Sequence, residues 1–196
     1  EAKLRNANTQ LEAQLKEIQK LQHTLHEQAV RDALTGLHNR RYLNETLGRE
    51  LARAERGGYS ICFALIDIDR FKSINDKYGH ATGDTVLIHL ANQLLKYTRT
   101  GDIICRYGGE EFLIILPNTK TEAAAQIAER WRATIEESKI SENDVEILVT
   151  ISCGISEFPV DASTEAEIIE AADKALYAAK YNGRNQVVLW SQIKDQ

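Results

Sequence analysis

The residues best suited to chemistry in this 196-residue chain are carboxylates at the end of an apolar run. Residues 60–68 read SICFALIDI, which has the length and the composition of a buried β-strand. Asp67 lies at the end of this run and Asp69 follows it. Ionised carboxylates at the end of a buried strand are costly to desolvate unless they are paired or bind a metal ion. This cluster is therefore a candidate metal site.

A second acidic pair, Glu110 and Glu111, follows a pair of glycines. Because Gly108 and Gly109 carry no side chains, a triphosphate could approach the backbone closely there. If the hairpin around these glycines lies beside the first strand, Asp67 and a glutamate converge at one sheet edge. Clustered carboxylate oxygens suit Mg²⁺, which keeps several waters and takes substrate phosphates as further ligands. Any one of these carboxylates could be a solvated turn residue, but two clusters beside a Gly-Gly turn favour a metal site.

The composition limits the partners of such a site. Hydrophobic residues make up 43% of the chain and charged residues 27%, which is enough apolar material for one core. The formal net charge is −5, so we expect no nucleic-acid partner and no general membrane-binding surface. A polyanion must then bind in a local site that contains metal. No window approaches the ~20 apolar residues of a membrane span, and the polar N-terminus does not resemble a signal peptide.

The three cysteines are Cys62, Cys105 and Cys153, and each falls inside an apolar run. Their odd number and their lack of short paired spacing suit a reducing compartment. We expect small buried thiols in a cytoplasmic protein.

The first element that positions the site is a helix at residues 1–28, which contain no Gly, Pro or aromatic residue. Leu4, Leu11, Ile18 and Leu25 repeat every seven residues, which predicts a heptad helix about 42 Å long. A lone helix would expose this stripe, so we expect it to pair with a second copy in a homodimer. The alternative is an amphipathic helix that packs on its own domain.

We divide the chain into a dimerising signalling helix at 1–29 and a globular domain at 30–196. The chain begins abruptly with a glutamate, and we expect an upstream sensor domain to precede it. A heptad seam also needs a second line of residues. The two candidate lines are Asn8, Leu15, Gln22 and Ala29, or Ala7, Gln14, Leu21 and Gln28. One hypothesis is that a sensor switches the helix between these registers, and the other is a loose linker whose polar seam limits dimer strength.

From residue 29 the pattern becomes an alternation of strands and helices. We predict helices at 39–56, 70–77, 81–98, 121–138 and 164–181, and strands at 60–68, 103–107, 111–116, 145–155 and 186–190. The two central strands flank Gly108–Gly109 as a two-residue turn. This mixed order predicts an α+β fold with helices across the faces of one sheet.

Four stretches of the sequence resemble the GGDEF family, in its GGEEF form. They are RYGGEEF at 106–112, DALTGLHNRR at 32–41, DIDRFKSINDKYGH at 67–80 with Gly83-Asp84, and ADKALY at 172–177 with Lys180 and GRN at 183–185. The resemblance covers about residues 30–190. A lone GGEEF would be weak evidence, but four motifs in order are specific.

The resemblance implies a fold similar to nucleotidyl cyclases and polymerase palm domains, with a central antiparallel sheet flanked by helices. It also implies a diguanylate cyclase, which condenses two GTP molecules into cyclic di-GMP and pyrophosphate. Such an enzyme depends on Mg²⁺, with Mn²⁺ as an alternative, and works as a dimer because each domain holds one nucleotide. The competing hypotheses are a non-catalytic GGDEF receptor for GTP or cyclic di-GMP and a purely structural coiled-coil module.

The family's site residues carry over to matching positions of this sequence. Asp67, the carbonyl of Ile68, Glu110 and Glu111 would hold the metal, and the two glutamates would be catalytic. The division of base and metal roles between Glu110 and Glu111 stays open. The substrate-binding residues would be Asn75 and Asp84 on the guanine edge, Phe71, Lys72, His80, Gly108 and Gly109 around the nucleotide, and Lys180 and Arg184 on the triphosphate.

Residues 99–102, RTGD, resemble the family's RxxD inhibitory site. The resemblance implies that the product binds Arg99 and Asp102 and inhibits the enzyme. Arg130 would supply a second arginine from a neighbouring domain, and Arg53 is a further candidate for the same role.

Overall fold

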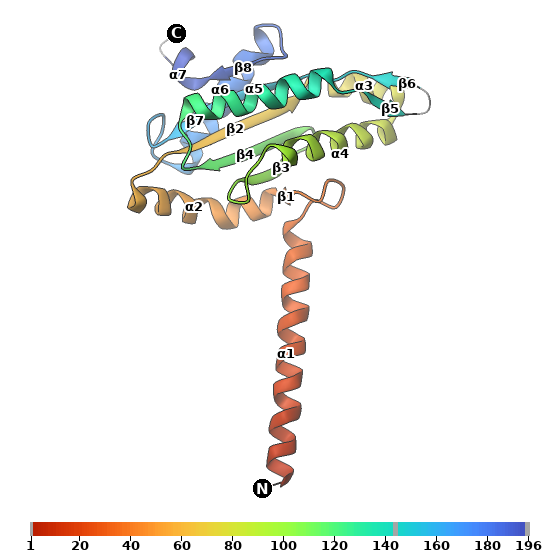
Figure 1. Cartoon of the computed structure of the whole chain (residues 1–196), viewed down its shortest axis with the longest axis vertical. Coiled ribbons are helices and arrows are strands. Elements are labelled where there is room, and N and C mark those ends of the chain that lie inside the picture. Colours follow the sequence, from red (N-terminus) through yellow and green to blue (C-terminus); the bar gives the residue numbers. More distant parts are fainter. Residues whose placement is uncertain (1, 143–144, 195–196) are drawn as a thin grey trace.

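The chain folds into a long N-terminal helix and a sheet with helices on both faces (Figure 1). A computed structural model describes residues 2–142 and 145–194, with the side chains at 2–4, 6, 7 and 142 left out. The helices are α1 (Ala2–Val30), α2 (Arg40–Gly57), α3 (Phe71–Tyr78), α4 (His80–Lys96), α5 (Thr121–Glu137), α6 (Glu165–Tyr181) and α7 (Trp190–Ile193). The strands are β1 (His38–Asn39), β2 (Ile61–Ile68), β3 (Ile103–Gly108), β4 (Glu111–Pro117), β5 (Ile140–Glu142), β6 (Val145–Ile147), β7 (Ile151–Phe158) and β8 (Val187–Leu189).

The main sheet has the strand order β1-β3-β4-β2-β7-β8. Its centre is antiparallel, because β4 pairs with β3 and β2, and β2 pairs with β7. Only the short edge strands β1 and β8 pair in parallel with their neighbours in this sheet. The predicted α+β fold with a central antiparallel sheet is confirmed.

Strand β2 is buried along its whole length because helices cover both of its faces. Its side chains alternate between the faces, as the period of two in a strand requires. Ile61, Phe63 and Leu65 pack in a cluster with residues of α2 and α6. Cys62 and Ile66 pack in the cluster formed with α3, α4 and α5. Continuing the alternation, Asp67 lies on the α2 and α6 side of the sheet.

The three cysteines are free and buried, as the sequence predicts. Burial raises the pKa of Cys62 and of Cys105 to about 12. These thiols therefore act as small apolar core residues.

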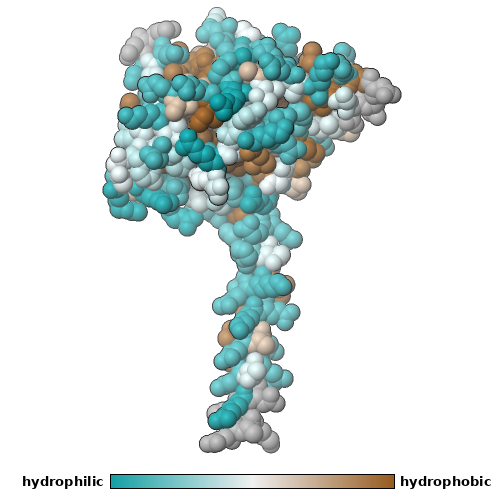
Figure 2. Space-filling view, viewed as in Figure 1, coloured by the Kyte–Doolittle hydropathy of each residue, from teal (hydrophilic) through white to brown (hydrophobic). Residues whose placement is uncertain are grey.

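Helix α1 extends away from the sheet as a stalk (Figure 1). Figure 2 shows it as mostly hydrophilic with separate apolar patches. The large apolar side chains of its stripe are 51–64% exposed, at Leu11, Leu15, Ile18, Leu21 and Leu25. The alternative in which this stripe packs on its own domain is therefore wrong for these residues. The side chains of Leu4 and Ala7, which belong to the expected seam, lie outside the described residues. Within residues 2–142 and 145–194, no helix has the length and apolarity to cross a membrane.

Two predicted features differ from the structure. The strand expected at 145–155 is divided, because β6 pairs with β5 in a separate hairpin and only β7 joins the main sheet. The turn between β3 and β4 is Gly109–Glu110 instead of Gly108–Gly109. A register shift between Arg106 and Gly108 adds a residue to β3, and Gly109 takes the left-handed conformation with φ of +49°. This shift places Glu110 itself in the turn.

Candidate active site

The carboxylates of the strand and of the hairpin meet at one end of the central sheet. The register of β2 and β4 places Asp67 directly opposite Glu111. Glu110 lies in the adjoining turn and is close enough to raise the pKa of Asp67. The expectation that the hairpin lies beside the first strand is confirmed.

A lysine from α6 also reaches this end of the sheet. The Lys180 Nζ lies 2.7 Å from Asp67 Oδ2. Helix α6 packs closely on β7 at Gly154, where an added methyl group would overlap Ala172 O and Leu176 N of the helix backbone. This close approach holds the helix that carries Lys180 against the strand next to β2.

The carboxylates outnumber the cation that neutralises them. Burial is the main cause that raises the pKa of Asp67 to about 6, and only 7% of this residue is exposed. Lys180 lowers this pKa, whereas the charges of Glu110 and Glu111 raise it. Removal from water disfavours the charged carboxylate, and a further cation nearby would favour it. The electrostatics of this cluster therefore favour the binding of a cation.

The residues present fit a magnesium ion that is shared with a substrate. In the described part of the chain, no three His, Cys, Asp or Glu side chains form a ready-made metal cage. Mg²⁺ does not need such a cage, because one or two carboxylates, waters and substrate phosphates complete its coordination. Asp67, Glu110 and Glu111 offer that kind of incomplete, oxygen-only site.

A second group of the expected residues gathers where α3 meets α4. The Asn75 Oδ1 is buried and has no hydrogen-bond partner in residues 2–142 and 145–194. Gly83 of α4 lies so close that an added methyl group would overlap this oxygen and would lie 3.2 Å from Phe71 Cζ. Asp84, next to Gly83, is exposed. A buried acceptor without a donor is costly, so Asn75 is suited to receive a donor from a ligand.

The remaining expected substrate residues lie on α3, on α4, in the hairpin of β3 and β4, and in the turn after α6. Lys72 on α3 and His80 at the start of α4 are exposed, as are Gly108 and Gly109. Arg184 lines a cavity of about 510 Å³ together with Asp69, Arg70 and Lys77.

Asp69 has a different environment from Asp67. Its carboxylate accepts hydrogen bonds from Thr150, Ser152 and the backbone N–H of Asn185. It is therefore committed to protein contacts and is not one of the oxygens open to a metal. Neither this role nor that of Asn185 was predicted from the sequence. The signal available was the asparagine that follows Gly183-Arg184 in the GRN stretch.

The RTGD segment forms a tight loop between α4 and β3. The Asp102 Oδ2 accepts a hydrogen bond of 2.7 Å from Arg99 N. Burial raises the pKa of Asp102, against the lowering effect of Arg99. Arg130 lies over the Tyr97 ring, with 5.7 Å between its Cζ and the ring centroid.

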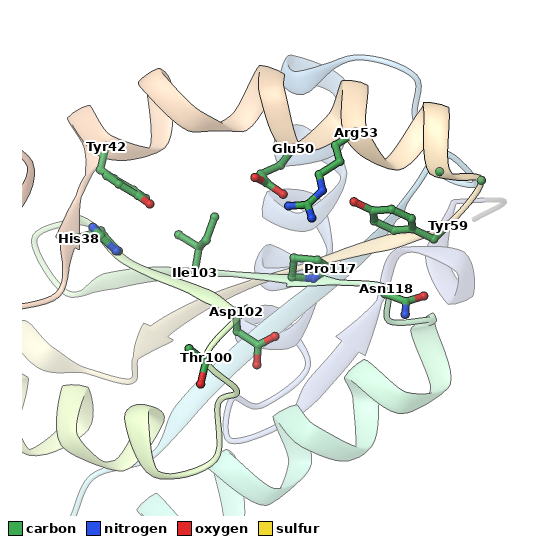
Figure 3. Close-up of a pocket in the computed structure, with 13 residues that line it drawn as sticks. His38, Tyr42, Glu50, Arg53, Tyr59, Thr100, Asp102, Ile103, Pro117 and Asn118 are labelled. Carbon is green, nitrogen blue, oxygen red and sulfur yellow. The ribbon is translucent and has the colours of Figure 1, made fainter.

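A cavity of about 850 Å³ adjoins this loop and is lined by Thr100 and Asp102. Figure 3 shows the side chains of Glu50 and Arg53 pointing into it from α2. Arg53, the further candidate for product binding, therefore lies beside the same loop of its own chain.

Comparison with known proteins agrees with this geometry. The model of the family described as "Diguanylate cyclase, GGDEF domain" matches residues 29–186. The chain is 45% identical over 170 residues to the response regulator PleD of Caulobacter vibrioides, covering 86% of this chain and 37% of PleD. It is 43% identical over 166 residues to diguanylate cyclase A of Treponema denticola, covering 83% of this chain and 45% of that protein. The chain thus spans less than half the length of these relatives.

Among solved structures, the chain resembles the coiled coil and GGDEF domain of DgcB from Caulobacter crescentus, solved in complex with c-di-GMP (cyclic di-GMP). The TM-score is 0.86 at 32% identity, and the match covers 95% of this chain and 98% of that one. The family model covers most of the chain, and both the fold and the carboxylate cluster agree with it. The chain therefore belongs to the GGDEF-domain family of diguanylate cyclases.

Proposed function

We propose that this chain is the catalytic part of a diguanylate cyclase, which converts two GTP molecules into one cyclic di-GMP and two pyrophosphates. The observation that carries this proposal is the register that sets Asp67 opposite Glu111, beside the Gly109–Glu110 turn. The relatives that are named diguanylate cyclases support it independently.

In this proposal Asp67, Glu110 and Glu111 hold Mg²⁺ or Mn²⁺ together with the carbonyl oxygen of Ile68. A bound divalent ion neutralises phosphate charge and favours displacement at phosphorus. The buried Asp67 carboxylate supports this assignment, since burial and the two glutamate charges raise its pKa and a cation relieves both effects. Glu110 and Glu111 are also the candidates for accepting the proton of the attacking hydroxyl group.

Asn75 and Asp84 read the guanine base, since a carboxylate can accept hydrogen bonds from its N1–H and its 2-amino group. The other residues around the nucleotide are Phe71, Lys72, His80, Gly108 and Gly109. Lys180 and Arg184 neutralise the triphosphate, which explains how a chain of net charge −5 accepts a polyanion. Lys180 would then contact a phosphate group and would pair less closely with Asp67.

The reaction requires two chains. The 3′-oxygen of one GTP attacks the α-phosphorus of the other, the bond to pyrophosphate breaks, and the reciprocal step closes the ring. Each domain holds one nucleotide, so two domains must face each other. The exposed apolar stripe of α1, from Leu11 to Leu25, supports a homodimer through this helix. An upstream sensor would control the enzyme by biasing how the two domains meet.

The direct test is incubation of the protein with GTP and Mg²⁺, followed by chromatography for cyclic di-GMP and an assay for pyrophosphate. We expect one cyclic di-GMP for every two pyrophosphates, no cyclic dinucleotide from ATP alone, and no product with a chelator. GTP binding without any product would instead indicate a receptor.

We expect Gly83→Ala to raise the KM for GTP by about 3–10-fold, the cost of one lost hydrogen bond. The added methyl group would overlap Asn75 Oδ1 and force this side chain away from the base. Steady-state kinetics with GTP measures the effect. Asn92→Ala, at an exposed position of the same helix, is the control and should leave KM unchanged. An unchanged KM in Gly83→Ala would show that Asn75 does not contact the base.

We propose that the product inhibits the enzyme through Arg99 and Asp102, with Arg130 as a second arginine. Arg99→Ala should raise the cyclic di-GMP concentration for half-inhibition at least about tenfold, since it removes a charge-assisted contact with a phosphate or base. The initial rate should change little. Lys96→Ala removes the same charge three residues away and is the control. Equal inhibition of all three proteins would mean that the RTGD resemblance is coincidental.

A further inference from the structure

We propose that Asp69 is a positioning residue for the triphosphate-binding cation Arg184. Arg184 lies in a turn, and Asp69 attaches this turn to the end of β2, where Asp67 also lies. The inference rests on the proposed function, because it takes Arg184 as a cation that contacts the triphosphate.

The first observation is that both oxygens of the buried Asp69 carboxylate accept hydrogen bonds. Asp69 is only 7% exposed. Its Oδ1 accepts a hydrogen bond of 2.7 Å from Ser152 Oγ. Its Oδ2 accepts one of 2.7 Å from Thr150 Oγ1 and one of 2.9 Å from Asn185 N. Thr150 and Ser152 fix the orientation of the carboxylate. The carboxylate then holds the backbone of the turn at Asn185.

The second observation is the conformation of that turn. Gly183, Arg184 and Asn185 have φ values of +115°, +67° and +48°, so three successive residues lie outside the usual backbone regions. A left-handed conformation costs a non-glycine residue about 1–3 kcal/mol and persists only where surrounding contacts impose it. Arg184 N donates to Ala179 O at the end of α6, with a distance of 3.0 Å. The bond from Asn185 N to Asp69 is the contact that ties the turn to the sheet.

The third observation is a clamp on the outer side of the turn. The Asn185 side chain accepts a hydrogen bond of 2.8 Å from Arg132 Nη1 and donates one of 2.8 Å to Glu136 Oε1. Arg132 also pairs with Glu129 and Glu136 on its own helix, α5, at 2.6 Å each. Asn185 is therefore held on one side by Asp69 and on the other by α5.

Asp69 links the position of the Asp67 carboxylate to that of the Arg184 guanidinium. Asp67 and Asp69 are two residues apart at the end of β2, and Arg184 directly precedes the residue that Asp69 binds. A shift of the strand end therefore moves the metal carboxylate and the triphosphate cation together. Arg184 lines one cavity with the basic side chains of Arg70 and Lys77 and with the carboxylates of Asp69 and Glu136. A misplacement of about 1 Å in such a group can cost a large factor in rate.

The test compares the binding of a triphosphate with that of a monophosphate. The ligands are α,β-methylene GTP, whose bridging carbon cannot leave, and GMP, each titrated calorimetrically into the whole chain with Mg²⁺. In Asp69→Asn the amide oxygen can still accept from Asn185 N while the NH2 group meets Ser152, but the bond to the turn loses the negative charge that makes it strong. We expect affinity for the methylene analogue to fall about tenfold and affinity for GMP to stay the same. That corresponds to about 1.4 kcal/mol in triphosphate binding alone.

Two further variants establish that Asp69 acts through Arg184. Arg184→Ala should lower the affinity for the triphosphate analogue in the same selective way. In the Arg184→Ala background, Asp69→Asn should have no additional effect, because the group it positions is gone. Thr150→Val keeps a β-branched side chain but removes a hydroxyl donor that holds the Asp69 carboxylate, and it should reproduce the selective loss. If Asp69→Asn does not fold, this variant decides the question.

The matched control is Glu157→Gln. Glu157 is a carboxylate of β7 with the same 7% exposure, and it accepts hydrogen bonds from Thr121 N and Thr121 Oγ1. Losing it should lower stability without changing the preference for triphosphate over monophosphate.

Equal losses of triphosphate and monophosphate affinity in Asp69→Asn, or effects that add to those of Arg184→Ala, would overturn the inference. So would unchanged binding in Asp69→Asn or Thr150→Val. These outcomes leave the proposed function standing if the wild type makes cyclic di-GMP. A wild type that does not bind the methylene analogue would overturn both.

Discussion

Glu110→Gln is expected to reduce the rate of cyclic di-GMP synthesis by at least about 10²–10³-fold, the usual cost of removing one electrostatic group from an active site. Glutamine keeps the size of the side chain but removes the negative charge that faces the proposed metal. Glu110 lies in the turn beside the Asp67–Glu111 pair, and its charge already acts on the pKa of Asp67. Product formation from GTP, measured by chromatography at equal dimer content, gives the rate.

The control for this variant is Glu122→Gln, which makes the same change at an exposed position in the first turn of α5. It should retain the wild-type rate. Because Glu110 is half-buried in a turn and does not belong to the core, its variant should keep the wild-type melting temperature. A Glu110→Gln protein that is folded, dimeric and still active would contradict the assignment of the site.

Asp67→Asn is expected to abolish activity while it stabilises the metal-free protein. Burial raises the pKa of Asp67 from 3.8 to about 6, so the folded protein keeps a proton at pH values where the unfolded chain has lost it. Between these values the unfolded chain releases this proton first, and the free energy of unfolding falls as the pH rises. The shift corresponds to about 3 kcal/mol. An asparagine stays neutral and avoids this cost above pH 6.

Thermal unfolding of the wild type and the variant, in a chelator and between pH 4 and pH 8, measures this effect. The stability difference should grow as the pH rises to about 6 and then stay constant. Addition of Mg²⁺ should stabilise the wild type and not the variant, since binding to the folded state raises its stability by mass action. A variant that is less stable than the wild type at pH 7 would show that the Lys180–Asp67 pair outweighs the cost of burial.

The cluster of Asp67, Glu110 and Glu111 lowers the stability of the metal-free protein. Three carboxylates stand near one lysine, and the fold supports this imbalance through buried strands on either side of Asp67. A chain selected only for stability would place an apolar or neutral residue at this position. The imbalance becomes useful when a cation and a triphosphate bind together.

The sequence was sufficient to predict where the carboxylates meet, and the reason is local. An apolar run as long as 60–68 forms a buried strand in most contexts, and a glycine turn between two such runs brings them side by side. Once that hairpin pairs with β2, the convergence of Asp67 with Glu111 follows from register alone. The helix at 1–28 was equally readable, because its heptad pattern needs no information from the rest of the chain.

Predictions failed where two local patterns compete. The turn moved by one residue because either Gly108–Gly109 or Gly109–Glu110 can reverse the chain, and the bulge in β3 decides between them. The strand expected at 145–155 was divided because its first part pairs with β5 instead of the main sheet. Hydrophobic periodicity marks both parts as strand and does not say which partner each one takes.

The difference between Asp67 and Asp69 shows what only the tertiary structure decided. The two residues have the same type and lie two positions apart at the end of the same strand, so residue type and spacing alone do not tell their roles apart. Asp67 faces Lys180 and the glutamates, whereas Asp69 is bound by Thr150, Ser152 and the backbone of Asn185. These donors lie 81, 83 and 116 residues further along the chain. Residue type and spacing determine which groups can ionise, but the groups that meet each charge depend on how distant strands and turns pack.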